Sequence, residues 1–333
     1  MCSPRSSSSL MLRPPFGRSI ASSSRCRARK PVLGCDPVAP LSKRKIGLAL
    51  SSGGARGSAH VGVLRVLVEN GIVPDVIAGS SMGAEIGGAY AAGTSLDDME
   101  SQWRSSSSGR VFRTLFPTIP WSGWSSGREV SRFLREIFGD RRIEDLPIPF
   151  AAVATDLETG GACPIRRGPL VEAIRASLSV PGLFTPVWID EHLLIDGGVS
   201  NPMPVDVARD LGADVVIAVD VLVDPSEVRI SGIPALSLRE RSLGIVKGLA
   251  APETNGRRFH PSVFSVLFQM STVFQKRLCD LLLRTHPPDV LIRPDFSADP
   301  PCYSAVGCGI DAGEEAARRA LSAIRRAIAG AAD

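Results

Sequence analysis

The sequence predicts an α/β fold with a central, mostly parallel sheet, and three observations support that expectation. A short apolar run, Ile46–Leu50, precedes a helical pattern over Ala59–Asn70. A second run, Val76–Ala78, precedes a helical stretch that ends at Ala92. A later run, Val215–Val219, has the length and composition of a buried strand. Strands that alternate with helices at this spacing are typical of parallel strands joined by crossover helices.

Apolar periodicity places the remaining elements along the chain. In the first helix, Val61, Leu64 and Leu67 share one face. Residues 101–126 are expected to form a loop with interleaved aromatic side chains, and residues 222–262 an irregular segment. The other expected elements are helices at 128–138, 169–178, 262–284 and 311–329, strands at 150–155 and 290–292, and a hairpin of strands 187–189 and 193–195.

The first 44 residues differ in composition from the rest of the chain. They are rich in Ser, Arg and Pro and carry nine basic side chains against one acid, a charge of +8 that leaves −4 on the other residues. The overall charge of +4 therefore does not favour nucleic-acid binding, and no such partner is expected. We expect residues 1–44 to form a disordered leader. An organelle transit peptide and a lipoprotein signal that ends at Cys35 remain as alternatives.

The cysteines and the hydropathy of the sequence indicate where in the cell the protein is expected and which cofactors it could bind. The seven cysteines are scattered without a CxxC pair, and Cys302 and Cys308 have no neighbouring histidine that would complete a zinc site. Reduced, unpaired thiols are typical of a cytoplasmic protein, which is the location expected here. No apolar run approaches the roughly 18 residues of a membrane-spanning helix. The sequence predicts neither a metal site nor another cofactor, since no carboxylate cluster suits calcium.

A serine at the centre of a G-x-S-x-G pattern is the candidate nucleophile. The pattern runs from Gly79 to Gly83 with Ser81 at its centre. In such a pattern a strand turns sharply into a helix and leaves the serine hydroxyl exposed at the tip. Small flanking residues avoid clashes in the strained backbone. Ser80 is the competing hydroxyl, and a simple structural turn is the alternative explanation.

A nucleophilic serine needs a base, and histidine is the first candidate. His192, His260 and His286 follow the serine in the chain, as an α/β-hydrolase triad requires, but none has an informative sequence context. His60 precedes the serine and is better explained as a structural histidine of the first helix. A conventional triad therefore has no specific support.

An Asp-Gly-Gly sequence is the second candidate for the base. Asp196 ends an apolar strand and is followed by Gly197 and Gly198. A carboxylate in this position can project into a site with little steric cover. A plain Asp-Gly turn explains the same residues equally well.

The glycine loop at Gly53–Gly57 follows the first strand and precedes the first helix, an arrangement that can hold an anion. A dinucleotide-binding loop would require an acidic residue at the end of the second strand, about 20 residues further on. That strand ends at Gly79–Ser81 instead, and the Lys-Ser/Thr pair of a phosphate-binding loop is missing. We therefore expect the loop to bind a charge that develops during a reaction.

In this order, the three motifs resemble those of the patatin-like phospholipases, most closely the bacterial branch related to neuropathy target esterase. Supporting stretches are Ala154–Leu157, Ser177–Gly182 and Asn201–Pro204. The resemblance is strong over Lys45–Leu211 and implies a three-layer α/β/α patatin-like fold with a central, mostly parallel sheet. It makes residues 45–211 a patatin-like catalytic core, and 212–333 the C-terminal part of the same domain, with a variable loop at 222–262.

The resemblance also implies a mechanism, which is a Ser–Asp dyad without histidine. Ser81 would be the nucleophile and Asp196 the base. The implied activity is hydrolysis of carboxylic ester bonds of (lyso)phospholipids or related lipids through an acyl-enzyme, without a cofactor and with peripheral membrane contact. A noncatalytic or regulatory patatin-fold interaction protein is the alternative.

The glycine loop would supply the oxyanion hole that this mechanism needs. The implied backbone donors lie at Gly53, Gly54, Ala55, Arg56 and Gly57, with Gly79, Gly83, Gly197 and Gly198 as supporting motif residues. The Arg56 side chain would add positive charge nearby. Ser52 departs from the family pattern, which has glycine at that position. Serine suits the loop there only if its backbone φ is not positive.

Overall fold

The computed structural model describes four stretches of the chain, residues 44–105, 127–225, 263–296 and 306–330. The chain divides into two compact units, and the unit Lys43–Asp333 contains every described residue. Almost all of the predicted leader at 1–44 lies outside the described residues, as do most of the aromatic loop 101–126 and most of the irregular segment 222–262.

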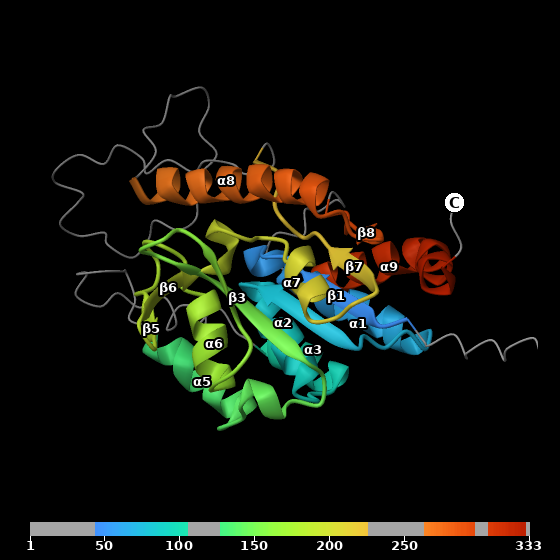
Figure 1. Ribbon diagram of the computed structural model, residues 1–333, viewed down its shortest axis with the longest axis horizontal. Helices are drawn as coiled ribbons and strands as arrows, with labels where there is room; N and C mark the ends of the chain where they lie inside the picture. Colours follow the sequence, from blue (N-terminus) through green and yellow to red (C-terminus); the bar gives the residue numbers. More distant parts are fainter. Residues whose placement is uncertain (1–43, 106–126, 226–262, 297–305, 331–333) are drawn as a thin grey trace, which may run out of the picture. The chain divides into compact units, whose positions relative to one another are not determined.

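An eight-stranded sheet lies at the centre of the described structure (Figure 1). Seven strands follow the order β5-β6-β3-β2-β1-β7-β8, and β4 pairs with β3 outside this path. The run from β3 to β8 pairs in parallel, whereas β3–β4, β3–β6 and β5–β6 are antiparallel. The strands are β1 Ile46–Leu50, β2 Val76–Ser80, β3 Phe150–Asp156, β4 Ala162–Ile165, β5 Val187–Ile189, β6 His192–Asp196, β7 Val215–Val219 and β8 Val290–Ile292.

The central strands are apolar because both of their faces are covered. Every residue of β1, β2, β3 and β7 is buried, as is typical of parallel strands enclosed by helices. Along β1, Leu48 and Leu50 belong to one core cluster and Ala49 to the other. Alternate side chains of each strand thus build two cores, one on each face of the sheet.

Helices cover both faces of the sheet and complete three layers. The larger core contains buried side chains from α1, α2, α3, α5, α6 and α9, and the smaller core contains buried side chains from α7 and α8. The predicted three-layer α/β/α fold is therefore confirmed, with an antiparallel edge at β4–β6. The helices are α1 Ser58–Glu69, α2 Met82–Ala91, α3 Leu96–Ser105, α5 Arg128–Phe138, α6 Leu170–Ser177, α7 Val205–Asp210, α8 Val263–Thr285 and α9 Val306–Ala329, with short 3-10 helices η1 Gly54–Gly57, η2 Ile143–Asp145 and η3 Gly197–Val199.

The structure corrects the sequence prediction in a few places. Residues 101–105 belong to α3 and not to a loop. Helix α3 begins after Ser95, whose hydroxyl accepts a hydrogen bond from the Asp98 N–H at 3.1 Å, and this capping contact stabilises a segment with weak apolar periodicity. The short elements β4 and α7 were not predicted, and the terminal helix α9 begins at Val306, five residues earlier than the predicted residue 311.

The expectation of unpaired thiols is wrong at one position. Cys163 and Cys279 are free, but Cys308 is disulfide-bonded. Spacing along the sequence does not show which cysteines the fold brings within bonding distance, because a disulfide depends on the separation of the Cβ atoms in space.

Candidate active site

Ser81 stands at the sharp turn between strand β2 and helix α2. Its backbone has φ 52° and ψ −118°, a conformation that costs a non-glycine residue roughly 1–3 kcal/mol. Glycine is needed on both sides of the turn. A Cβ at Gly79 would lie 2.2 Å from the Gly83 carbonyl oxygen, and a Cβ at Gly83 would lie 2.2 Å from the Leu50 carbonyl oxygen. The structure thus has the strained strand–turn–helix that the G-x-S-x-G pattern predicts.

Asp196 meets this serine although it lies 115 residues further along the chain. The Ser81 hydroxyl donates to Asp196 Oδ2 at 2.6 Å, and the Gly198 N–H donates to Asp196 Oδ1 at 2.8 Å. Asp196 ends β6, and the next position needs glycine because a Cβ at Gly197 would lie 2.0 Å from the Val153 carbonyl oxygen. Ser81 and Asp196 are both buried, and we call them the Ser–Asp pair.

Burial changes the acid–base chemistry of this carboxylate. Desolvation raises the pKa of Asp196 to about 6, although the hydrogen bonds from Ser81 and Gly198 act in the opposite direction. A carboxylate with a pKa nearer to neutrality is a stronger base than a solvated one. At neutral pH the group is still largely ionised, and it can accept the proton of the hydroxyl that is already bonded to it.

Two serines at the end of α6 hold both members of the Ser–Asp pair. The Ser81 N–H donates to Ser177 Oγ at 2.8 Å, and the Ser177 hydroxyl donates to the Val153 carbonyl oxygen at 2.5 Å. The Asp196 N–H donates to the Ser179 carbonyl oxygen at 2.9 Å. Sequence reasoning did not predict this role. Only the family resemblance marked this stretch, since local pattern cannot show which backbone groups its side chains reach.

The glycine loop lies beside the serine turn. A Cβ at Gly57 would lie 2.7 Å from the Cβ of Met82, the residue that follows Ser81. Gly54 and Ala55 are exposed and begin the 3-10 helix η1. The N–H groups at the start of a helix have no acceptor within it, so these two point out of the helix as available donors.

Arg56, which the sequence predicted as a further donor and a nearby positive charge, makes contacts within the protein. Its N–H donates to the Gly53 carbonyl oxygen at 3.2 Å, so this group is already used. Its guanidinium is buried and lies 4.5 Å from the centre of the Phe296 ring, a cation–π arrangement. Of the five predicted donor residues, Gly54 and Ala55 are exposed, Gly53 is half-buried, and Arg56 and Gly57 are buried.

Ser52, the departure from the family pattern, fits the loop without a glycine-like backbone. Among the described non-glycine residues, positive φ occurs at Ser81 and Asp190 and not at Ser52. The Ser52 N–H donates to the Pro202 carbonyl oxygen at 3.0 Å, and its hydroxyl donates to Gln275 Oε1 at 3.0 Å. The side chain that replaces glycine thus connects the glycine loop to helix α8.

His60 supports the same loop from inside the protein. Its Nε2–H donates to the Ser51 carbonyl oxygen at 2.9 Å, and the ring is completely buried. Burial lowers the pKa of His60 to about 4, so the imidazole is neutral at physiological pH. This agrees with the expected structural histidine of the first helix.

The other histidines make no hydrogen bond to Ser81 within the described structure. His192 begins β6, whereas Asp196 ends it, and His192 Nδ1 lies 2.6 Å from Asp156 Oδ2. His286 is exposed just after α8. His260 lies outside the described residues.

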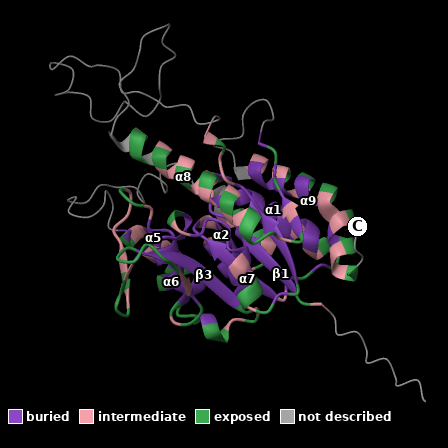
Figure 2. Cartoon of the chain, turned by 45° about the horizontal axis from the view of Figure 1, so that its top comes forward, coloured by how far each residue is buried: buried purple, intermediate pink, exposed green. Residues whose placement is uncertain are grey.

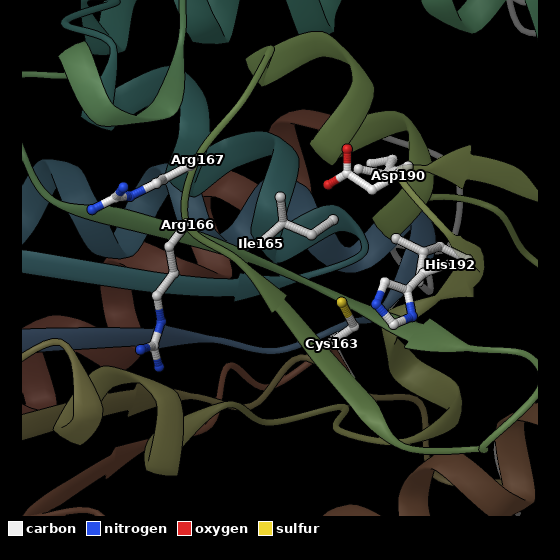
Figure 3. A pocket seen from close by; sticks show the side chains of 8 residues that line it. Cys163, Ile165, Arg166, Arg167, Asp190 and His192 are labelled. Atoms are coloured by element: carbon white, nitrogen blue, oxygen red, sulfur yellow. The ribbon is translucent and has the colours of Figure 1, made fainter.

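An open hollow lies beside the turn at Asp190 that joins β5 to β6 (Figure 3). Figure 3 shows Arg166 and Arg167 extending away from Asp190 and His192, so the charged groups do not converge on one point. Neither member of the Ser–Asp pair lines this hollow. Its lining residues are Cys163, Ile165, Arg166, Arg167, Ile189, Asp190, His192 and Leu194.

The described ranges contain no group of three His, Cys, Asp or Glu side chains that could hold a metal ion. None of the helices in these ranges is both long enough and apolar enough to cross a bilayer. Several carboxylates that could otherwise bind a metal ion form ion pairs with arginines. Asp289 pairs with Arg209 at 2.8 Å, and Glu314 pairs with Arg318 at 2.7 Å.

Comparison with known proteins identifies similar sequences. Residues 48–209 match the family model described as patatin-like phospholipase, a range that includes all three motifs. An uncharacterised NTE family protein of Mycobacterium tuberculosis is 44% identical over 180 residues, which cover 54% of this chain and 50% of that protein. Patatin-like phospholipase domain-containing protein 7 of Rattus norvegicus is 41% identical over 186 residues, which cover 54% of this chain and 14% of that protein.

The match therefore spans about half the length of the mycobacterial relative and a much smaller share of the rat protein. Among solved structures, VipD from Legionella pneumophila is similar with a TM-score of 0.46 and 12% sequence identity. That similarity covers 84% of this chain and 67% of the VipD chain.

Proposed function

We propose that this chain, whose residues 48–209 form a patatin-like phospholipase domain, is a serine hydrolase that cleaves carboxylic ester bonds of phospholipids, lysophospholipids or related lipids. The observation that carries the proposal is the 2.6 Å hydrogen bond from the Ser81 hydroxyl to Asp196 Oδ2. It joins a hydroxyl on a strained turn to a desolvated carboxylate, and these are the two groups that nucleophilic attack on an ester needs.

In the first half of the reaction, Ser81 Oγ attacks the ester carbonyl carbon while Asp196 accepts the hydroxyl proton. The carbonyl oxygen becomes an oxyanion, and the N–H groups of Gly54 and Ala55 donate hydrogen bonds to it. The carbon–oxygen bond to the alcohol then breaks. The departing alcohol takes the proton from Asp196, and Ser81 keeps the acyl group as an ester.

In the second half, water replaces the alcohol. Asp196 accepts a proton from the water as its oxygen attacks the acyl carbon, and the same loop donors stabilise the second oxyanion. Ser81 Oγ leaves, recovers the proton from Asp196, and the carboxylic acid is released. The cycle needs no imidazole because one buried carboxylate, with a pKa raised to about 6, serves as base and acid in turn. We further propose that the enzyme meets its lipid substrate at a membrane surface.

Covalent labelling tests the proposed nucleophile. A fluorophosphonate probe reacts with activated serines, and peptide mass mapping identifies the labelled residue. We expect the label on Ser81 in the unmodified protein, none in Ser81→Ala, and much slower labelling in Asp196→Asn, where the base is lost.

Ser80→Ala is the matched control because Ser80 adjoins the nucleophile and its Oγ has no hydrogen-bond partner within the described residues. This variant should keep the label on Ser81. If the folded, unmodified protein takes up no label at Ser81, the hydrolase proposal is wrong and a noncatalytic patatin-fold protein becomes the better explanation.

A further inference from the structure

Helix α8 exposes an unusual number of apolar side chains. Five of the nine exposed large apolar side chains among the described residues belong to this one helix. Phe274 is the most exposed of the five, at 64%, and Figure 2 shows exposed residues recurring along α8. The other four are Val266, Leu267, Met270 and Leu281.

Most of these side chains fall on one stripe of the helix. Steps of three, four and seven residues return to the same face, and two exposed arginines occupy the same register. We name this face the α8 stripe and define it as Leu267, Met270, Phe274, Arg277, Leu281 and Arg284. An apolar stripe usually faces the core of a protein, but this one faces solvent.

The opposite face of α8 packs against the candidate active site. Gln275 accepts the hydrogen bond from Ser52, and its Cδ would lie 2.8 Å from a Cβ at Gly198. Lys276 Nζ lies 3.2 Å from Asp220 Oδ2 and ties the helix to the end of β7. A helix with its side chains is about 10 Å across. The α8 stripe is therefore about one helix diameter from the glycine loop and from the turn after Asp196.

We propose that the α8 stripe docks the protein on the surface of a phospholipid membrane that contains anionic lipid. This inference rests on the proposed function. The ester bonds of a membrane lipid lie at the boundary between headgroups and acyl chains, and Asp196 is only 1% exposed, so an ester has to enter the protein to reach the Ser–Asp pair, and docking at that boundary brings the two together. A helix with an apolar face of this kind embeds roughly 5–10 Å deep in that boundary.

The charges on the stripe favour an anionic surface over a second copy of the chain. Within the described residues, neither Arg277 nor Arg284 forms an ion pair, and Asp280 is paired with Lys276 at 3.1 Å. A second copy packed on the stripe would bury these arginines without a carboxylate partner, which is costly. Anionic lipid headgroups supply the missing negative charge, because basic residues near such a surface are attracted to it.

Vesicle co-sedimentation tests the proposal in a Ser81→Ala background, which prevents digestion of the lipid. The probes are vesicles of phosphatidylcholine alone and vesicles in which about a quarter of the lipid is phosphatidylglycerol. We expect strong binding to the anionic vesicles and weaker binding to the neutral ones. The double substitution Met270→Gln/Phe274→Gln should weaken both by about tenfold or more, because it removes the buried apolar area. Arg277→Gln/Arg284→Gln should weaken binding to the anionic vesicles selectively.

The matched control is Leu157→Gln/Trp188→Gln, which removes two exposed apolar side chains away from α8, one directly after β3 and one on β5. It should bind vesicles like its parent, and melting temperatures check that each variant is folded. No binding by the parent, or equal binding by the Met270→Gln/Phe274→Gln variant, overturns the proposal. So does a dimer in sedimentation velocity that dissociates on the same substitutions, which would assign the stripe to a second copy. Hydrolysis of a water-soluble short-chain ester by the unmodified protein tests the proposed function separately, because a soluble substrate does not require membrane binding.

Discussion

A buried carboxylate with a close partner lies at each end of strand β6, Asp196 of β6 itself at one end and Asp156, the last residue of β3, beside His192 at the other, and their pKa values shift in opposite directions. At one end, Asp196 is 1% exposed and accepts two hydrogen bonds, and desolvation raises its pKa. At the other end, Asp156 accepts from two backbone N–H groups and pairs with His192. Hydrogen bonds, first from the Thr159 N–H and then from His192, lower the pKa of Asp156. A short contact to a partner is therefore not enough to make a carboxylate a base.

The difference between the two carboxylates bears on whether the site is a Ser-His-Asp catalytic triad. An aspartate 2.6 Å from a histidine resembles two members of a catalytic triad, but His192 is largely exposed and has no hydrogen bond to the candidate nucleophile. No histidine in the described ranges bonds to the Ser–Asp pair, yet its carboxylate is the one made more basic by its surroundings. Both carboxylates are buried, but the hydrogen bonds from Thr159, His192 and Glu158 outweigh desolvation at Asp156, whereas desolvation outweighs the hydrogen bonds at Asp196.

The largest expected difference between the two carboxylates is in catalysis. Asp196→Asn should lower kcat/KM for a soluble ester by about 10³-fold or more, because an amide cannot accept the Ser81 proton. Asp156→Asn makes the same change of atoms at the other end of β6 and should cost less than about tenfold. Steady-state kinetics on both purified variants measure the contrast. Equal losses in the two variants would contradict the assignment of Asp196 as the base.

The pH dependence of the reaction should follow the buried carboxylate. Asp196 accepts a proton only when it is ionised, so kcat/KM should fall by about tenfold for each pH unit below its pKa of about 6. The inflection should stay in place in Asp156→Asn and in His192→Gln. A pH–rate profile of the three proteins is the measurement, and an inflection that disappears in His192→Gln would point to the histidine instead.

The smallest effect is on stability, and it should have opposite signs at the two ends. The folded pKa of Asp196, about 6, exceeds the ordinary aspartate pKa of 3.8, so ionisation costs stability as the pH rises through 6. Asp196→Asn should therefore be more stable than the unmodified protein by roughly 1–3 kcal/mol at pH 8, with no difference near pH 4. The pKa of Asp156 is lowered, so Asp156→Asn should lose stability at pH 8. Urea unfolding at pH 4 and at pH 8 measures the free energy of unfolding of each variant. An Asp196→Asn variant that is less stable than the unmodified protein at pH 8 would contradict the raised pKa of Asp196.

Sequence pattern could predict the layers because apolar runs and helical periodicity report burial directly. Val215–Val219 and the helix at 128–138 coincide with β7 and α5. The segment at 101–105 was wrongly assigned because the serine run that follows it obscured a helix whose start depends on the Ser95 cap. Local signals of this kind are weak when they lie next to residues with low helix propensity.

The choice between Asp196 and a histidine could not be made from the residues alone. The Asp-Gly-Gly sequence was equally consistent with a turn, and only the family resemblance favoured a dyad. A pKa depends on desolvation and on hydrogen bonds across the fold, and these come from residues such as Ser81 and Gly198 that no spacing rule connects to Asp196. The roles of Ser177 and Gln275 were missed for the same reason, since each acts through a contact distant in sequence.

The glycines around the site limit the substitutions that its backbone can accept. At Gly79, Gly83 and Gly197, even one added carbon would lie 2.0–2.2 Å from a backbone oxygen of a neighbouring segment. The serine turn is therefore packed against the main chain at the end of β1, and the aspartate turn against the main chain of β3, and no side-chain adjustment can make room. Substitution has almost no freedom at these three positions, so changes in sequence around the site have to fall in the elements that surround it, such as α8.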